Sequence, residues 1–164
     1  MKTKILVLLF LIPLWMLAQT HSWSNYRGNE ALTGVTKEKI PAKATLLWTF
    51  KATDIIKSSS VTDGKNIYFG SNDGTLYALD KTGRQVWTFK TETALEAPPL
   101  LVDGLVVIGS LEGIMFAIDA QTGKEKWRYK TDGQISGSAN WSFQASRKSK
   151  QIFFGSYDFF LHTV

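Results

Sequence analysis

The sequence predicts an all-β protein, namely part of a β-propeller built from four-stranded antiparallel blades. Three observations support this fold class. A unit of about 40 residues repeats along the chain, each copy ends in a strand that contains tryptophan, and short strand patterns alternate with turns that contain glycine. No segment places apolar residues with a period of 3.6, so we expect little helix.

The repeat is visible in the spacing of three tryptophans. Trp48, Trp87 and Trp127 follow one another at intervals of 39 and 40 residues. The segment 70–80 (GSNDGTLYALD) aligns without gaps with the segment 109–119 (GSLEGIMFAID), and a weaker third copy follows. A β-sandwich also contains regularly spaced short strands, but the fixed period and the recurring tryptophan favour a propeller.

Each unit consists of short strands separated by turns. The pair Asp63-Gly64 favours a hairpin because glycine supplies the positive φ that such turns need. Strands are indicated by β-branched and aromatic residues and by side chains that alternate with a period of two. We expect the strands of the first unit at residues 59–62, 67–69, 75–80 and 86–89. We expect those of the second unit at residues 100–102, 105–108, 114–118 and 127–129.

The N-terminus of the chain predicts export. Residues 1–20 begin with Lys2 and Lys4, continue with an apolar stretch and end in small or polar residues, which is the pattern of a secretory signal peptide. The apolar stretch is shorter than the roughly 20 residues that span a bilayer, and Pro13 interrupts it. We therefore expect a periplasmic or extracellular protein with no transmembrane segment once the signal peptide is removed.

After the signal peptide, we expect an extended N-terminal segment at residues 21–45 and a partial propeller at residues 46–164. The propeller part holds two full blades and a third that lacks its last strand, whereas propellers close with about 4–8 blades. Leu46–Lys51 has the character of a fourth strand but no preceding strands of its own blade. We expect this strand to complete a ring by pairing with a C-terminal blade encoded beyond Val164.

Composition limits the chemistry that the chain can perform. The sequence has no cysteine, which excludes disulfides and thiolate metal sites, and only two histidines, His21 and His162. Removing Lys2 and Lys4 from the 19 basic residues leaves 17 against 14 acidic residues, a net charge of +3. The basic residues are scattered along the chain, so we expect no nucleic-acid binding.

The position of a residue within the repeat separates structural from catalytic candidates. Carboxylates recur at equivalent turns directly before glycine, as blade-building residues would, whereas a catalytic residue is needed once. These are Asp63, Asp73, Asp103 and Glu112. We therefore assign no catalytic, cofactor-binding or metal-binding residue. In the third copy, His162 replaces an aromatic residue and is interpreted as a packing side chain without a partner. Phe159 replaces a turn glycine, so that turn must avoid positive φ or be strained.

Segment 117–127 resembles the tryptophan-docking motif of quinoprotein-dehydrogenase-like propellers, also called PQQ-repeat propellers. It matches the full pattern of alanine, one residue, aspartate, two residues, threonine-glycine, three residues and tryptophan, and segment 78–87 matches it with one residue fewer. Segment 23–29 (WSNYRGN) also resembles the opening of exported members, and the overall resemblance covers roughly residues 46–164. The motif residues are Ala78, Asp80, Thr82, Gly83, Trp87, Ala117, Asp119, Thr122, Gly123 and Trp127, with Trp48 at the equivalent position before the first copy.

The resemblance implies that each indole seals the space between adjacent blades and bonds a neighbouring backbone group. It also implies one of two functions. Some members bind pyrroloquinoline quinone with calcium and oxidise alcohols or sugars, whereas many others bind no quinone and act as scaffolds. We predict a non-catalytic binding or scaffolding module without a cofactor, whose partner is a protein or a small ligand at the propeller mouth. The alternative is the N-terminal fragment of a PQQ-dependent alcohol or sugar dehydrogenase.

Overall fold

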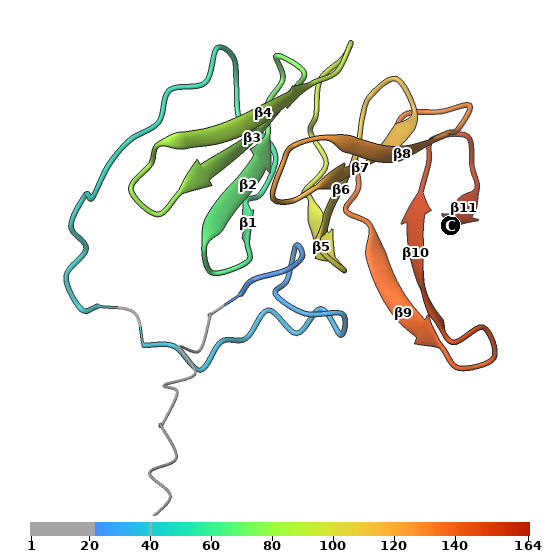
Figure 1. Cartoon of the computed structure of the whole chain (residues 1–164), viewed down its shortest axis with the longest axis horizontal. Coiled ribbons are helices and arrows are strands. Elements are labelled where there is room, and N and C mark those ends of the chain that lie inside the picture. Colours follow the sequence, from blue (N-terminus) through green and yellow to red (C-terminus); the bar gives the residue numbers. More distant parts are fainter. Residues whose placement is uncertain (1–21, 40) are drawn as a thin grey trace, which may run out of the picture.

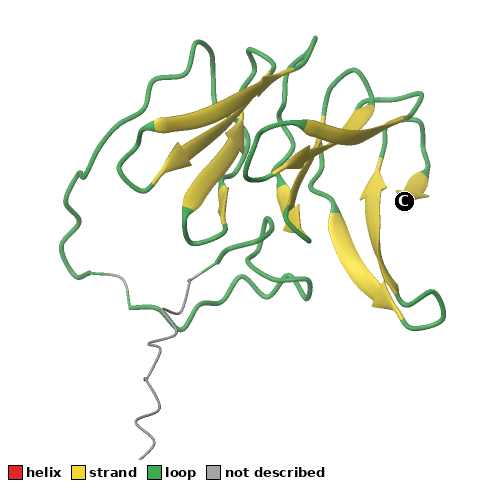
Figure 2. Cartoon of the chain, in the orientation of Figure 1, coloured by secondary structure: helices red, strands yellow, loops and turns green. Residues whose placement is uncertain are grey.

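The computed structural model describes residues 22–39 and 41–164, so the predicted signal peptide at residues 1–20 lies outside the described residues. The described chain consists of β-strands joined by turns and loops (Figure 2). Within these two ranges, no helix has the length and apolar character that crossing a membrane requires. The prediction of an all-β fold is confirmed.

The strands form three antiparallel sheets, which are the predicted blades (Figure 1). The first blade contains β1 (Val61–Thr62), β2 (Asn66–Gly70), β3 (Thr75–Asp80) and β4 (Gln85–Lys90). The second contains β5 (Leu100–Val102), β6 (Leu105–Gly109), β7 (Ile114–Asp119) and β8 (Glu125–Lys130). The third contains β9 (Asn140–Gln144), β10 (Ser149–Gly155) and β11 (Leu161–Thr163). Two complete blades and part of a third are therefore present, as predicted.

The core lies between the blades, because the middle blade buries both of its faces. Successive side chains of a strand point to opposite faces. In β6, Val106 and Ile108 join the apolar cluster shared with the first blade, whereas Val107 joins the cluster shared with the third. In β7, Phe116 and Met115 divide in the same way. This double burial explains why these two strands read as nearly continuous apolar runs.

The two complete blades carry the same irregularity at the docking motif. The register between the last two strands shifts directly after Ala78 in the first blade and after Ala117 in the second. Ala78 lies opposite Trp87, and Ala117 lies opposite Trp127. Both alanines are fully buried. A small side chain opposite each indole therefore leaves the ring free to turn toward the next blade.

Residues 22–34, which we call the axial segment, cross the inner strands of the blades (blue in Figure 1). Trp23 pairs with Thr62 of β1 through two backbone hydrogen bonds of 2.8 and 2.9 Å. The carbonyl of Ser24 accepts a hydrogen bond of 2.7 Å from the backbone N–H of Leu101 in β5. The segment thus joins the innermost strands of the first two blades.

The axial segment reaches the third blade through side chains. Asn25 is fully buried, and its Nδ2 donates to the carbonyl of Asn29 at 2.7 Å and to Oδ1 of Asn140 at 3.4 Å. Asn140 in β9 returns a hydrogen bond of 3.0 Å from its Nδ2 to the carbonyl of Glu30. One short segment therefore contacts the first strand of every blade.

Two local features correct or complete the sequence predictions. The structure assigns no strand at Leu46–Lys51, whose expected partner is not among the described residues, so this strand stays a prediction. A strand needs a hydrogen-bonded neighbour, and within the described residues none lies beside this segment. Phe159 adopts a φ of 73° with its side chain almost fully exposed, so the turn of the third blade takes the strained alternative.

Candidate functional site

The structure places Trp87 of the docking motif at the seam between the first two blades. Its indole Nε1 donates a hydrogen bond of 3.0 Å to the carbonyl of Ala120 in the second blade. The ring lies against the turn that contains Gly123, where an added Cβ would come within 2.7 Å of the indole. Gly123 also has a φ of 70°, which glycine adopts without strain. The glycine is thus required both by the backbone and by the ring.

Trp48 makes the same contacts with the first blade, although no strand holds it. Its Nε1 donates to the carbonyl of Lys81 at 2.9 Å, and its ring lies against Gly83. Trp127 is half-buried and packs on the cluster between the second and third blades. Two of the three spaced indoles therefore dock on a turn glycine of the following blade.

The motif aspartates are occupied by the turns in which they lie. Oδ1 of Asp119 accepts hydrogen bonds from the backbone N–H of Thr122 at 2.9 Å and from its hydroxyl at 3.0 Å. These bonds, with the nearby Lys126 ammonium, lower the pKa of Asp119 to about 2. The hydroxyl of Thr82 likewise holds the pKa of Asp80 well below its usual range. Both carboxylates build their turns.

Asp63 and Asp73 are also hydrogen-bonded by residues of their own blade, whereas Asp103 pairs with Lys150 of the third blade. Asp63 accepts from the backbone N–H of Asn66 at 2.7 Å and from the hydroxyl of Tyr68 at 2.9 Å. Burial, with the nearby Asp63 carboxylate, raises the pKa of Tyr68 to about 12. Burial favours a raised pKa for Asp73 too, but hydrogen bonds such as the one of 2.8 Å from Tyr77 hold it below its ordinary value. In the described ranges, no cluster of three or more histidine or acidic side chains could hold a metal ion.

His162 has a partner that the sequence interpretation missed. Its ring stacks on Phe154 with the ring centroids 5.5 Å apart, so the packing role is confirmed. Its Nε2 also lies 2.9 Å from Oδ2 of Asp158, so the interpretation that it has no partner is wrong. The contact repeats the one between Tyr77 and Asp73, four residues apart in both blades. Aligning the acidic position of the copies could have revealed this pair.

A polar pocket of about 350 Å³ opens where the loops before the inner strands converge. We call it the axial pocket, and it is lined by Tyr26, Lys57, Ser59, Glu96, Pro98, Ser136, Gly137 and Ser138. Lys57, Glu96 and Ser136 lie nine residues after Trp48, Trp87 and Trp127, respectively. Equivalent positions of the repeat thus present a cation, an anion and a hydroxyl. Nζ of Lys57 lies 2.6 Å from Oε1 of Glu96, so an ion pair bridges the first two blades here.

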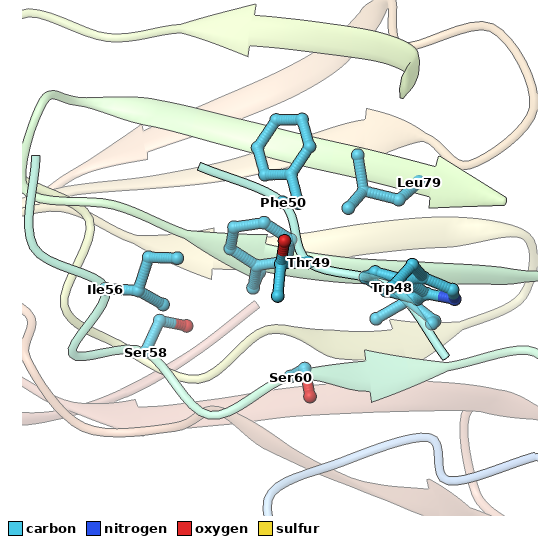
Figure 3. Close-up of a pocket in the computed structure, with 9 residues that line it drawn as sticks. Trp48, Thr49, Phe50, Ile56, Ser58, Ser60 and Leu79 are labelled. Carbon is cyan, nitrogen blue, oxygen red and sulfur yellow. The ribbon is translucent and has the colours of Figure 1, made fainter. Parts of the chain in front are cut away.

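A second pocket, of about 360 Å³, lies beside Trp48 on the face of the first blade that points away from the second (Figure 3). Phe50 packs edge-on against Phe69 and Tyr77, with centroids 6.0 and 5.2 Å apart. The rest of the lining includes Ile56 and Leu79 and contains serine and threonine but no titratable group. This pocket offers apolar contact rather than acid–base chemistry.

The sequence profile of the family described as outer membrane protein assembly factor BamB matches residues 39–156, which is more than half of the chain. The chain belongs to this family. Among solved structures, BamB from Moraxella catarrhalis is 24% identical with a TM-score of 0.59, and the match covers 72% of this chain and 36% of that one. Quinohemoprotein alcohol dehydrogenase from Comamonas testosteroni is 21% identical with a TM-score of 0.65, covering 84% of this chain and 23% of that one.

A third similar structure is the computationally designed Ika4 protein, which is 16% identical with a TM-score of 0.50 over 61% of this chain and 59% of that one. At these identities the likenesses show the fold alone. Together with the family profile, they confirm the resemblance to PQQ-repeat propellers. The BamB-family chain described here spans only 36% of the Moraxella protein. A comparison with curated protein sequences gives no significant match.

Proposed function

We propose that this chain is part of an exported, non-catalytic β-propeller that binds a partner protein at its mouth. The observation that carries the proposal is the axial pocket. The repeat keeps the same residue types at its docking positions, yet it places Lys57, Glu96 and Ser136 at one equivalent position around a single opening. Loops held by a rigid scaffold are where binding residues concentrate. Different side chains at this position suit recognition better than blade building.

Membership of the BamB family supports a protein partner and an extracytoplasmic location. The family is named for the assembly of outer membrane proteins. The signal-peptide pattern of residues 1–20 supports export independently of that name. Together they favour a binding module of the bacterial periplasm.

The alternative is a fragment of a quinone-dependent dehydrogenase, which is favoured by the structural match over 84% of the chain. Calcium with a quinone needs several oxygen ligands that converge. The turn carboxylates Asp63, Asp73 and Asp119 are bonded to their own turns, and Asp103 pairs with Lys150 of the third blade. The buried amide oxygens without a partner, on Asn25, Asn72 and Gln144, belong to the axial segment, the first blade and the third blade. These described residues do not fit a quinone–calcium site, which favours the non-catalytic proposal.

The enzymatic alternative is tested by adding pyrroloquinoline quinone and Ca²⁺ to the protein purified from its native host. Dye-linked oxidation of primary alcohols and of aldose sugars is then followed, with a known quinoprotein dehydrogenase as the positive control. We expect no oxidation above the rate without protein. Quinone-dependent turnover would overturn the non-catalytic proposal.

The binding proposal is tested with variants of the axial pocket. Lys57→Ser with Glu96→Ser removes the charges of the pocket, and Lys81→Ser with Glu92→Ser makes the same change on exposed turns away from it. Envelope proteins are captured on the tagged wild type and on both variants, after thermal melting has shown that all three fold. We expect the pocket variant to lose a partner that the control variant keeps. Equal retention by both variants would contradict a site at the mouth.

A further inference from the structure

We propose that the free edge of β9 is a second binding site, which accepts an extended segment of a partner protein as an added strand, with acidic residues at one end of that segment. The site shares no lining residue with the axial pocket. It therefore goes beyond the function proposed above and can be tested separately.

The hydrogen-bond pattern shows which backbone groups face the free edge. Ile152 of β10 lies opposite Trp141 of β9 and exchanges two hydrogen bonds of 2.9 Å with Val164 on its other side. Trp141 and Ile152 are therefore a non-hydrogen-bonded pair, and the backbone groups of Trp141 point away from β10. The N–H of Trp141 donates to Oδ1 of Asn140 at 2.9 Å. By the alternation of the strand, the N–H and C=O of Phe143 point to the same free edge.

This edge differs from those of the other inner strands. β1 and β5 are two and three residues long, and each hydrogen-bonds to the backbone of the axial segment. β9 has five residues and meets that segment only through the side chain of Asn140, among the contacts of the described chain. The carbonyl of Trp141 and both backbone groups of Phe143 are thus left for a further strand. Unpaired edges of this kind are templates for strand addition.

A cavity of about 450 Å³ follows this edge. Trp141 and Phe143 line it from one face of β9, and Ser142 and Phe153 line it from the other face. Ala31 of the axial segment forms the opposite wall. The cavity therefore wraps around the strand edge, and the Phe143 side chain, which is 59% exposed, offers an apolar contact to the added strand.

The charges at the two ends of β9 decide at which end the acidic residues of the added strand lie. The hairpin that follows β9 carries Arg147 and Lys148, both exposed and without an ion pair in the described chain. Lys150 is already held, because its Nζ lies 2.6 Å from Oδ1 of Asp103 and over the ring of Trp141. Glu30 lines the cavity at the other end of β9, beside Asn140. Acidic residues are therefore favoured where the added strand approaches the hairpin tip.

Labelled peptides test the proposal by fluorescence anisotropy with the whole chain. The first peptide is Asp-Glu-Asp-Val-Thr-Val-Thr, the second replaces its acidic residues by lysine, and the third is the first peptide N-methylated at alternate residues. We expect the first to bind and the other two to bind at least about tenfold more weakly. No binding of the first peptide, or equal binding of the N-methylated one, would overturn strand addition. Equal binding of the lysine peptide would overturn the acidic preference.

Protein variants locate the peptide on the chain. Arg147→Glu with Lys148→Glu should weaken binding about tenfold, whereas Lys81→Glu with Lys124→Glu, which changes net charge equally on distant turns, should leave binding unchanged. Phe143→Pro removes the outward N–H without touching the ladder to β10, and it should weaken binding more than Phe143→Ala, which keeps that N–H. Thermal melting controls the fold of every variant. Equal effects within either pair would overturn the proposal.

Two further outcomes separate this site from its alternatives. The axial-pocket variant with Lys57→Ser and Glu96→Ser should bind the peptide as the wild type does. If it does not, the peptide occupies the mouth, and the β9 proposal fails while the mouth proposal stands. Sedimentation of the chain alone should show a monomer. If the chain self-associates and Phe143→Pro abolishes that association, the occupant of the edge is a second copy of this chain, and the partner segment proposed here is wrong.

Discussion

At the residue scale, the docking motif works because an indole and a glycine occupy one small space. Gly123 has a φ of 70° and lies under the ring of Trp87. The indole hydrogen bond to the carbonyl of Ala120 fixes the ring over that turn. Any side chain at Gly123 would push the ring off the turn and strain the backbone together. The two residues should therefore act as one energetic unit.

The variants Trp87→Ala and Gly123→Ala test this coupling. We expect each to lower the free energy of unfolding, the first by about 3 kcal/mol because it empties a packed site. The double variant should cost clearly less than the sum of the two, because each change alone already breaks the same contact. Urea unfolding measures all three, and Val86→Ala on the exposed side of β4 should change stability by less than about 0.5 kcal/mol. Strictly additive costs would refute the coupling.

The motif aspartates predict loss of stability in acid. Hydrogen bonds from Thr122 lower the pKa of Asp119 from 3.8 to about 2, so the folded chain holds this carboxyl ionised where the unfolded chain protonates it. The stabilisation is therefore complete above the ordinary value and is lost as the pH falls through that interval. Asp119→Asn should flatten the pH dependence of the urea midpoint between pH 4 and about 2. An unchanged profile would show that the turn bonds do not form in solution.

At the element scale, local sequence patterns predicted the strands and turns that depend on local chemistry. The turn pairs Asp63-Gly64 and Thr82-Gly83, together with period-two alternation, indicated the strands of both complete blades, and the structure contains them. Leu46–Lys51 has the same composition, but no strand is assigned there because its expected partner is not among the described residues. Strand propensity therefore indicates where a strand can form, and pairing decides whether it does.

The axial segment could not be predicted from the sequence, because its contacts join distant residues. Asn25 and Asn140 lie 115 positions apart, and neither belongs to the repeat pattern. The sequence revealed only part of the role of the loops that lie nine residues after each tryptophan. The repeat placed Lys57, Glu96 and Ser136 in equivalent positions, but their convergence on one pocket required the arrangement of all three blades.

Asn25→Ala tests whether the axial segment joins the blades. The change removes a buried donor to Asn29 and Asn140, so we expect a loss of about 1–2 kcal/mol in the free energy of unfolding. Hydrogen exchange of the Leu101 amide, which donates to Ser24, should also become faster. Lys37→Ala in the exposed chain that follows serves as the control. Unaltered exchange at Leu101 would show that this segment does not hold the second blade.

At the scale of the whole molecule, the blades form a scaffold, and we propose that the mouth carries the function. The middle blade is buried on both faces, so its residues are committed to packing. The carboxylates of Asp63 and Asp119 accept hydrogen bonds from their own turns. The residues that line the axial pocket belong neither to the apolar clusters nor to these turns, and blades on three sides hold them in place. This division explains how a repeating sequence can present a site that does not repeat.

Site-specific photo-crosslinking tests this account most directly. A photoreactive amino acid is placed at Ser136 or at Lys57, both in the axial pocket, or at Val86 on an exposed strand outside it. After irradiation of living cells, covalent adducts are identified by mass. We predict that Ser136 and Lys57 capture the same envelope protein and that Val86 captures none. Capture from Val86 alone, or the same proteins from all three positions, would contradict a binding mouth.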